Sequence, residues 1–338
     1  MLKDFKPRFA AALLILSVSA GRAAPPPPPP PPAWPPPPAE PCIVYVRDIS
    51  GPQDIGVKPF ILMRFANWIT GVGQDGKLKL DKPFGLSVDD AGNLVVTDTG
   101  RSEICFLDLP RKKWLRWKSA GKQRFLSPVA AVHHGQTFFV ADSALGKVIA
   151  FDAKGKVQFE ITGELGRPTG LALSGDRLVI ADSQFHQIVI CGVNGRFISK
   201  FGGRGRGPGE FNFPTHVGVD AAGCIYVTDS MNHRIQVFDA NGRFLREFGS
   251  VGDGPGHFNR PKGVAVDRAG HVYVVDALFG NVQIFDDQGR LLLDWGEAGS
   301  AAGQFWLPNA IAINSRDEIF VADVYNHRVQ VFRYTGRQ

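Results

Sequence analysis

Residues 214–260 read PTHVGVDAAGCIYVTDSMNHRIQVFDANGRFLREFGSVGDGPGHFNR, and residues 261–296 begin the pattern again with PKGVAVDRAGHVYVVDALFGNVQIFDDQGRLLLDWG. The Asp that ends each VYVTD-like run serves as a ruler for this repeat. It occurs six times, at intervals of 44, 40, 47, 47 and 47 residues, as Asp98, Asp142, Asp182, Asp229, Asp276 and Asp323. A period of this length is typical of chains built from stacked supersecondary units.

Each repeat has the pattern of four β-strands. Six residues after every ruler Asp stands a β-branched residue, namely Ile104, Val148, Ile188, Ile235, Val282 and Val329. The apolar residues alternate or run in short bursts between Gly, Asp-Ala-Gly and Asn-Gly turns, which indicates strands rather than helices. In the repeat that starts at Pro214, we expect strands at 216–219, 225–228, 235–238 and 244–248. A four-stranded antiparallel sheet that recurs at this spacing predicts a blade of a propeller.

The motifs of the repeat resemble a known family. Pro-x-Gly-Val-Ala-Val-Asp, Val-Tyr-Val-x-Asp, Asn-His-Arg-Ile-Gln-Val-Phe and Gly-x-Gly-x-Gly-x-Phe are clearest in residues 201–286 and 303–332. Together they resemble the NHL repeat over roughly four-fifths of the chain. The resemblance implies an all-β fold, a six-bladed β-propeller of four-stranded antiparallel blades. It implies no particular activity, because function depends on a site and not on a fold.

The first 24 residues have the pattern of a signal peptide. Lys3, Lys6 and Arg8 precede an apolar run from Phe9 to Val18, and small residues follow it. The run is too short to cross a bilayer comfortably, which favours cleavage and export. We therefore expect a periplasmic or secreted protein, with an envelope-associated one as the alternative if an uncleaved N-terminus tethers the chain to a membrane.

Residues 25–41 contain thirteen prolines and one Trp. Proline fixes φ and lacks a backbone donor, so the segment is expected to form a polyproline II linker without a core of its own. It can act as a spacer, or as a docking site for an aromatic-lined groove, and the sequence leaves both functions open.

Residues 42–75 form an N-terminal strand segment before the six repeats, which span 76–336. The last repeat stops after its third strand, so one blade lacks a fourth strand. Residues 60–70 resemble the fourth strands that end in Glu160-Ile161 and Glu247-Phe248. We therefore expect 60–70 to join the last blade as the N-terminal strand that closes the ring and protects its edge. A closed ring of this kind is expected to be monomeric.

No group of residues predicts a catalytic or metal site. The six ruler Asp residues recur at one turn in every repeat, which indicates structural caps for backbone N–H groups. His186, His233 and His327 share one repeat position, so the repeat accounts for them. NHL-like amidating lyases use a zinc ringed by His, but here only His216 stands at the start of an inner strand. The cysteines show no Cys-x-x-Cys motif and no haem motif. We expect no metal and no cofactor.

Two further patterns point away from nucleotides and nucleic acids. The glycine-rich runs 202–209 and 249–256 lack the Gly-Lys-Ser/Thr of a phosphate loop and recur between blades, which favours tight turns. The basic run RKKWLRWK at 111–118 falls where blade one needs its outer strand. The formal net charge of +6 is mild. We do not expect a nucleic-acid partner.

The remaining candidate is a binding face. In a propeller, the loop after the second strand and the loop that joins two blades emerge on the same side, and rigidly held loops often carry function. The candidate residues on these loops are Arg204, Arg206, His216, Met231, Asn232, Asp253, His257, Phe279 and Tyr325. The sequence favours an exported, non-enzymatic protein that binds a protein or a cell-envelope component through this face. The alternative is a hydrolase or lyase at the tunnel mouth, with His216 as its base.

Overall fold

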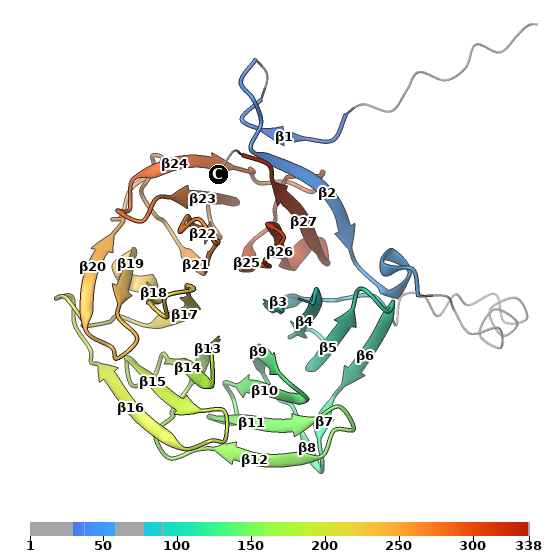
Figure 1. Cartoon of the computed structure of the whole chain (residues 1–338), viewed down its shortest axis with the longest axis vertical. Helices are drawn as coiled ribbons and strands as arrows, with labels where there is room; N and C mark the ends of the chain where they lie inside the picture. Colours follow the sequence, from blue (N-terminus) through green and yellow to red (C-terminus); the bar gives the residue numbers. More distant parts are fainter. Residues whose placement is uncertain (1–29, 37, 58–77, 90, 337–338) are drawn as a thin grey trace, which may run out of the picture. The chain divides into compact units, whose positions relative to one another are not determined.

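The computed structural model describes residues 30–36, 38–57, 78–89 and 91–336. Six blades of antiparallel strands stand around a central axis, as predicted (Figure 1). In the first five blades the strands run in chain order from the axis outward, and in the sixth an N-terminal strand follows the last three strands of the chain on the outside. The predicted all-β fold and blade number are therefore confirmed.

The strands of the first three blades follow the predicted order. Blade one has β3 (Pro83–Val88), β4 (Asn93–Asp98), β5 (Glu103–Asp108) and β6 (Lys113–Trp117), blade two has β9 (Pro128–His134), β10 (Thr137–Asp142), β11 (Lys147–Asp152) and β12 (Val157–Ile161), and blade three has β13 (Pro168–Ser174), β14 (Arg177–Asp182), β15 (Gln187–Gly192) and β16 (Phe197–Gly202). A short hairpin of β7 (Ser119–Ala120) and β8 (Gln123–Arg124) stands between blades one and two.

The last three blades repeat this pattern almost residue for residue. Blade four has β17 (Pro214–Val219), β18 (Ile225–Asp229), β19 (Arg234–Phe238) and β20 (Phe244–Phe248), blade five has β21 (Pro261–Val266), β22 (Val272–Asp276), β23 (Asn281–Phe285) and β24 (Leu291–Trp295), and blade six has β25 (Pro308–Ile313), β26 (Glu318–Asp323) and β27 (Arg328–Tyr334). The basic run 111–118 includes β6, the expected outer strand of blade one.

The core lies between neighbouring blades, where apolar side chains of adjacent sheets interlock. Aromatic residues at the end of the third strands are almost fully buried there, namely Phe151, Phe238, Phe285 and Phe332. A second layer of buried rings comes from the glycine-rich loops between blades, with Phe211, Phe258 and Phe305 at 0% exposure. Gly202 has φ of 100°, and a Cβ there would lie 2.5 Å from the Phe211 ring, so this position requires glycine.

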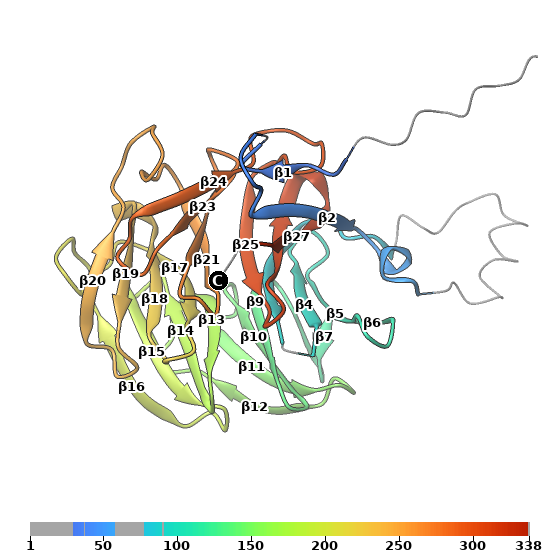
Figure 2. The ribbon, with the colours of Figure 1, turned by 45° about the horizontal axis from the view of Figure 1, so that its top comes forward.

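An N-terminal strand closes the ring, but it is not the one we expected. β2 (Ile43–Ile49) pairs antiparallel with the outer edge of β27, with Ile49 opposite Val329 and Asp48 opposite Gln330. Figure 2 shows β2 running along the outside of the last blade. The predicted closing segment, 60–70, lies outside the described residues, and the edge assigned to it is already occupied by β2. The assignment is therefore corrected to 43–49.

Part of the proline-rich segment belongs to the folded unit. β1 (Ala33–Trp34) pairs with β2, and the backbone N–H groups of Cys42 and Tyr45 donate to the carbonyls of Trp34 and Pro32. The Trp34 ring packs edge-on against Phe332, with 6.0 Å between ring centroids. The segment was expected to have no core of its own, and its described part packs on the core of the last blade through Trp34. After β2 comes a short 3-10 helix, η1 (Pro52–Ile55).

Candidate functional site

Two sets of loops form one face of the propeller, which we call the loop face. It consists of the loops between the second and third strands of each blade and the loops that join one blade to the next. Backbone hydrogen bonds tie the two sets together, from Ser183 N to Arg167 O, from Ala277 N to Arg260 O and from Tyr325 N to Trp306 O. The two 3-10 turns η2 (Ser230–Asn232) and η3 (Val324–Asn326) belong to the first set. The loops therefore form a connected surface.

The ruler Asp residues hold this face in place from below. All six are 0% exposed, and each carboxylate accepts at least one backbone N–H from the loop that leads into its own blade. Asp98, for example, accepts from Asp81 N at 2.7 Å and Lys82 N at 3.0 Å. A carboxylate engaged in this way caps the turn and has little freedom to act on a substrate.

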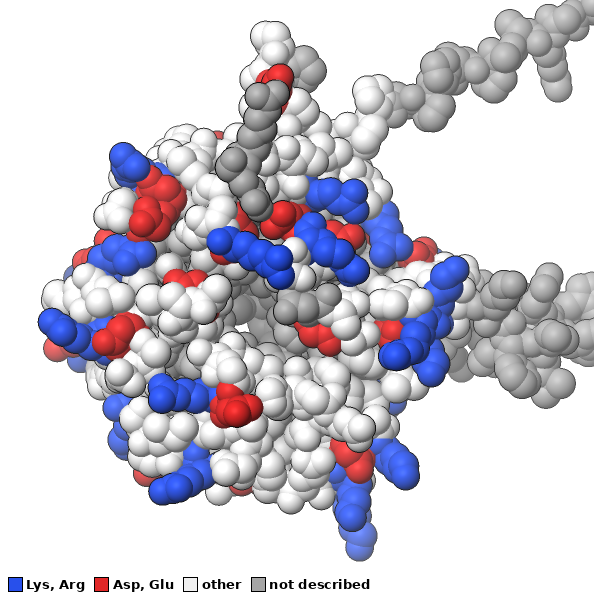
Figure 3. Space-filling model, viewed as in Figure 1, with Lys and Arg blue, Asp and Glu red and all other residues white. Residues whose placement is uncertain are grey.

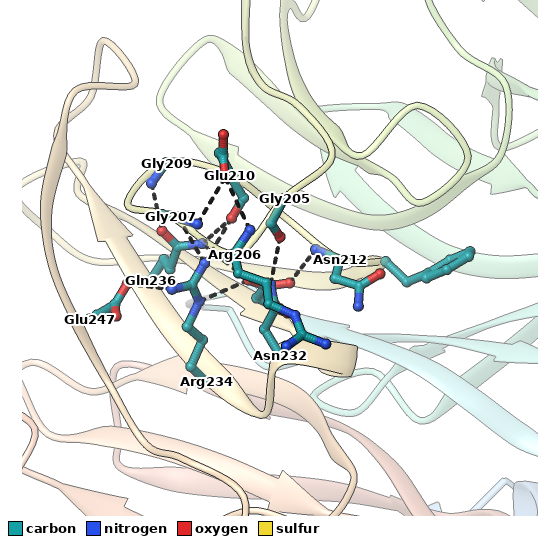
Figure 4. Close-up of polar contacts among 12 residues, drawn as sticks. Gly205, Arg206, Gly207, Gly209, Glu210, Asn212, Asn232, Arg234, Gln236 and Glu247 are labelled. Carbon is teal, nitrogen blue, oxygen red and sulfur yellow. Dashed lines mark hydrogen bonds and ion pairs between the residues drawn. The ribbon is translucent and has the colours of Figure 1, made fainter.

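The glycine-rich loop before blade four is fixed by side chains from η2 and β19 (Figure 4). Arg234 Nη2 donates to the carbonyls of Gly207 and Glu210, at 2.9 and 3.0 Å. Gln236 donates to Glu210 O and accepts from Gly209 N, so it satisfies both groups of the loop backbone. The Asn232 amide is also used, donating to Gly205 O at 2.9 Å. Asn232, one of the predicted face residues, thus holds the loop.

The inner strands surround a central channel whose ends differ. Away from the loop face lies a cavity of about 200 Å³, lined by strand ends such as Val88, His133 and Val266. Towards the loop face lies a smaller cavity of about 30 Å³, lined by residues such as Gly85, Gly170 and His216. Figure 3 shows one face of the ring with a central hollow, around which basic and acidic side chains are interspersed.

His216 and Asn309 meet at the end of the channel towards the loop face. Asn309 Nδ2 lies 3.2 Å from His216 Nε2 and donates to Phe84 O at 3.1 Å. An amide nitrogen can only donate, so His216 Nε2 accepts and its Nδ1–H faces Thr215 Oγ1 at 3.2 Å. Burial, together with a smaller effect of the charge of Lys262, lowers the pKa of His216 to about 3. His216 is therefore a neutral link between blades four and six.

Lys262 is the charged group nearest to this link. It occupies the same repeat position in blade five that Thr215 and Asn309 occupy in blades four and six. The pKa of Lys262 is lowered to about 8, mainly by burial and also by the neighbouring Arg260, while the charge of Asp276 raises it. No described carboxylate forms an ion pair with Lys262. The centre of the loop face thus holds a half-buried ammonium group without a directly paired anion.

Exposed apolar side chains gather on the same face. Nine of the fifteen large hydrophobic residues that the structure shows as exposed lie on its loops, namely Leu126, Phe185, Phe213, Met231, Val251, Leu278, Trp306, Leu307 and Tyr325. The other six lie on the outer strands, and none lies in the turns at the opposite end of the blades. Trp306 and Tyr325 pack together with 5.7 Å between ring centroids, and Lys82 Nζ lies 5.4 Å from the Tyr325 ring centre.

The predicted face residues divide into three groups. Arg204, Arg206, Asp253 and His257 are exposed on the loops between blades, and Met231 and Tyr325 are exposed at 54% and 41%. Asn232 and Phe279 are partly buried in their turns, and Asn232 is committed to the scaffold. His216 lies inside the channel mouth.

Several residues of this face were missed by the sequence analysis, and five of them, Phe213, Lys262, Trp306, Leu307 and Asn309, share a place in the repeat. Each lies within two residues of the Pro that begins an inner strand. That Pro recurs in all six repeats while its neighbours change in chemical type. The variation around a fixed position was the signal that could have found them.

The structure accounts for the other residues that were considered as catalytic or metal-binding candidates. His186, His233 and His327 adopt left-handed backbone conformations, with φ between 53° and 57°, at the turns after the second strands. All four cysteines are free, and burial raises the pKa of Cys191 to about 11. Within the described part of the chain, no group of three or more His, Cys, Asp or Glu side chains could hold a metal ion. No helix in the same residues is long and apolar enough to cross a membrane.

Comparisons with known proteins agree with the architecture. A family model described as a 6-bladed beta-propeller matches residues 162–223 and 219–278, and the NHL repeat model matches residues 305–332. No curated protein matches the sequence.

Solved structures share the fold at low identity. A hydrazine synthase of Kuenenia stuttgartiensis aligns with 13% identity and a TM-score of 0.55, over 76% of this chain and 96% of its own. The virginiamycin B lyase of Staphylococcus aureus aligns with 14% identity and a TM-score of 0.55, over 75% and 94%. A gluconolactonase of Xanthomonas campestris aligns with 14% identity and a TM-score of 0.56, over 75% and 86%. Such likeness concerns the fold alone. Together with the repeats and the six closed blades, the family matches show that this chain is an NHL-repeat six-bladed β-propeller.

Proposed function

We propose that the protein is an exported binding module whose loop face recognises a partner protein. The observation that carries this proposal is the uneven distribution of exposed apolar side chains, nine of which lie on the loop face. Apolar groups concentrated on one face mark a contact surface more often than scattered ones do.

The residue types on the loop face favour a protein over a wall polymer. Its exposed side chains include aromatic residues, a methionine and arginines, the types that are enriched at protein interfaces and their energetic centres. Trp306 is 57% exposed and Met231 is 54% exposed, while Arg204 and Arg206 are exposed on the loop before blade four. That loop is held by Arg234 and Gln236, so its surface is formed before any partner arrives.

The enzymatic alternative has weaker support. A general base works best when its pKa lies near the working pH. His216, the base that a hydrolase or lyase would need here, has its pKa lowered to about 3, and its Nε2 already accepts from Asn309. A hydrolytic or eliminating activity of the purified protein that disappears in His216→Ala, with the fold intact, would establish this alternative.

Export is part of the proposal and depends on the N-terminal pattern of residues 1–24. Cell fractionation tests it directly, because the mature chain should appear outside the cytoplasm and be shorter than the full sequence. A full-length chain in the membrane fraction would instead support tethering by an uncleaved N-terminus.

The binding proposal is tested by capture with the exported protein and two matched double variants. Trp306→Ser with Met231→Ser alters the loop face, and Leu245→Ser with Leu292→Ser alters outer strands that are exposed to a similar degree, 44% and 53%. We expect a partner protein that the wild type and the outer-strand variant retain and the loop-face variant loses. Equal capture by all three would refute the proposal, and retention of a wall polymer instead of a protein would redirect it to the cell envelope.

A further inference from the structure

Two rings of side chains surround the centre of the loop face. The first contains the residue before the Pro of each inner strand, and its members are Lys82, Ser127, Arg167, Phe213, Arg260 and Leu307. The second contains the residue after that Pro, and its members are Phe84, Val129, Thr169, Thr215, Lys262 and Asn309. Four of the twelve side chains are basic and none is acidic. Three of the basic residues precede the Pro and one, Lys262, follows it, so the two positions that flank the Pro carry only positive charge.

The acidic residue that acts on Lys262 is already engaged. Asp276, which lies below Arg260 and Lys262, accepts backbone N–H bonds from Asn259 and Arg260 and from the turn after β22. The other ruler Asp residues cap their own turns in the same way. They are fully buried, so they form the floor beneath the rings and do not present carboxylate oxygens at the surface.

The polar groups around Lys262 satisfy one another without it. His216 links Asn309 and Thr215, and the Thr215 hydroxyl lies 2.6 Å from Ser230 Oγ, which donates to Pro261 O. This network is neutral because His216 accepts at Nε2. A half-buried charge is costly unless it is paired, and no described group provides the pair. Lys262 is thus left as the group at this centre that an external anion would satisfy.

Apolar side chains flank this charge. Phe213 and Leu307, exposed at 43% and 37%, belong to the same ring as Arg260. Met231 and the Trp306–Tyr325 pair lie on neighbouring loops. A ligand with only an acidic group would contact only the centre of the loop face. A ligand whose acidic group lies between apolar groups would contact both the centre and the apolar side chains around it.

We propose that the centre of the loop face is a carboxylate-binding site, at which Lys262 receives an acidic side chain of the partner protein that lies between apolar side chains. This inference rests on the proposed function, because it names the chemistry that the same face selects. Arg260 and Arg167 add to the attraction from the outer ring, and Asn309 and His216 form the floor on which the carboxylate is placed.

A random peptide library selected on the immobilised, folded protein tests the inference without knowledge of the partner. For the wild type, we expect enrichment of peptides in which Asp or Glu stands between aromatic or aliphatic residues. In Lys262→Gln the acidic preference should disappear while the apolar preference stays, and affinity for a wild-type-selected peptide should fall at least tenfold. Lys262→Arg should retain the acidic preference, and Lys154→Gln, at an exposed turn on blade two, is the matched control.

The outcomes separate the two proposals. Apolar enrichment without an acidic preference, or an acidic preference that persists in Lys262→Gln, overturns the carboxylate site and leaves the loop-face function standing. A lack of any enrichment, or peptides that bind the Trp306→Ser, Met231→Ser variant as well as the wild type, overturns the loop-face function and the inference with it. Unfolding curves of each variant show that the fold is intact.

Discussion

Asp48 and Arg328 stand 280 residues apart in the chain and form an ion pair, with 2.9 Å between Asp48 Oδ2 and Arg328 Nη1. In blade four, Arg234 makes the same contact with Glu247 at 2.8 Å, but Glu247 belongs to that blade's own fourth strand. Asp48 therefore takes the place of a residue that the last repeat lacks. β2 reproduces both the backbone pairing and the polar contact of a fourth strand.

The first prediction concerns this closing strand. A chain that starts at Ser50 should unfold at a much lower temperature than one that starts at Cys42, and it should aggregate. Loss of β2 opens the edge of β27 and exposes the core where Ile43 and Ile49 were buried, at a cost of at least about 3 kcal/mol. Thermal unfolding of the two chains, followed by light scattering, measures the effect. Equal melting temperatures would show that β2 does not close the ring.

A second prediction separates the two partners of the ion pair. Arg328→Met should destabilise the protein by about 3–5 kcal/mol, because it removes the cation paired with the buried Asp323 and one donor from each of two loop carbonyls. Asp48→Asn should cost no more than about 1 kcal/mol, because its carboxylate is partly exposed to water. Urea unfolding of both variants measures the difference, and Glu247→Gln in blade four is the control for Asp48→Asn. Equal losses for the two changes would contradict this assignment.

The sequence predicted the blades well because each is specified locally. The ruler Asp, the turns and the strand pattern recur within every repeat, so six copies support one another. The closing strand was missed because we chose residues 60–70 for their general resemblance to the fourth strands of other blades. The better signal was the order of an acidic residue followed by an apolar one, seen in Glu247-Phe248 and Asp294-Trp295 and repeated in Asp48-Ile49.

The centre of the loop face was less predictable than the blades. His216 was found because no other His stands at the start of an inner strand, but its partner Asn309 lies 93 residues away and meets it only after the propeller closes. Asn232 was assigned to the binding surface because it lies in a loop, yet its amide is used by the neighbouring loop backbone. A position in a loop predicts that a side chain is exposed. Its hydrogen-bond partners cannot be predicted in this way, because they come from neighbouring loops that meet only in the assembled propeller.

The third prediction uses the pKa of His216. This pKa is lowered from an ordinary value of 6.5 to about 3, so between these values the unfolded chain binds a proton that the folded chain does not. Stability should therefore fall as the pH drops from about 6.5 towards 3, by up to about 1.4 kcal/mol per pH unit from this group. Urea unfolding between pH 7 and pH 4 should give a shallower dependence for His216→Gln than for the wild type. His133, whose pKa burial also lowers, should retain its own contribution in both.

The fourth prediction concerns the rigidity of the glycine-rich loops. In Gln236→Ala, the amide of Gly209 loses its acceptor and Glu210 O loses a donor, so the loop should open more often. Amide hydrogen exchange at Gly209 should accelerate by at least tenfold, in line with a cost of about 1–3 kcal/mol for the unpaired groups. Gly256, held in the same way by Gln283 in blade five, provides the internal reference and should keep its rate. Faster exchange at both glycines would mean that the whole propeller, and not this loop, was destabilised.

The last prediction is that the partly buried charge of Lys262 destabilises the folded chain. Burial lowers its pKa from 10.5 to about 8, with Arg260 in the same direction and Asp276 opposed, while His216 stays neutral in this range. Below pH 8 both folded and unfolded chains carry the charge, so the folded state bears the full cost of burying it, and stability rises as the pH increases from 8 to 10.5. Lys262→Met should therefore stabilise the protein at pH 7, and its advantage should shrink by pH 10. Urea unfolding at both pH values, with the exposed Lys154→Met as the control, measures this. If Lys262→Met is more stable and Lys262 is also required for selecting acidic peptides, binding explains why this position carries a lysine. If Lys262→Met is less stable, the charge of Lys262 already has a partner in the folded chain.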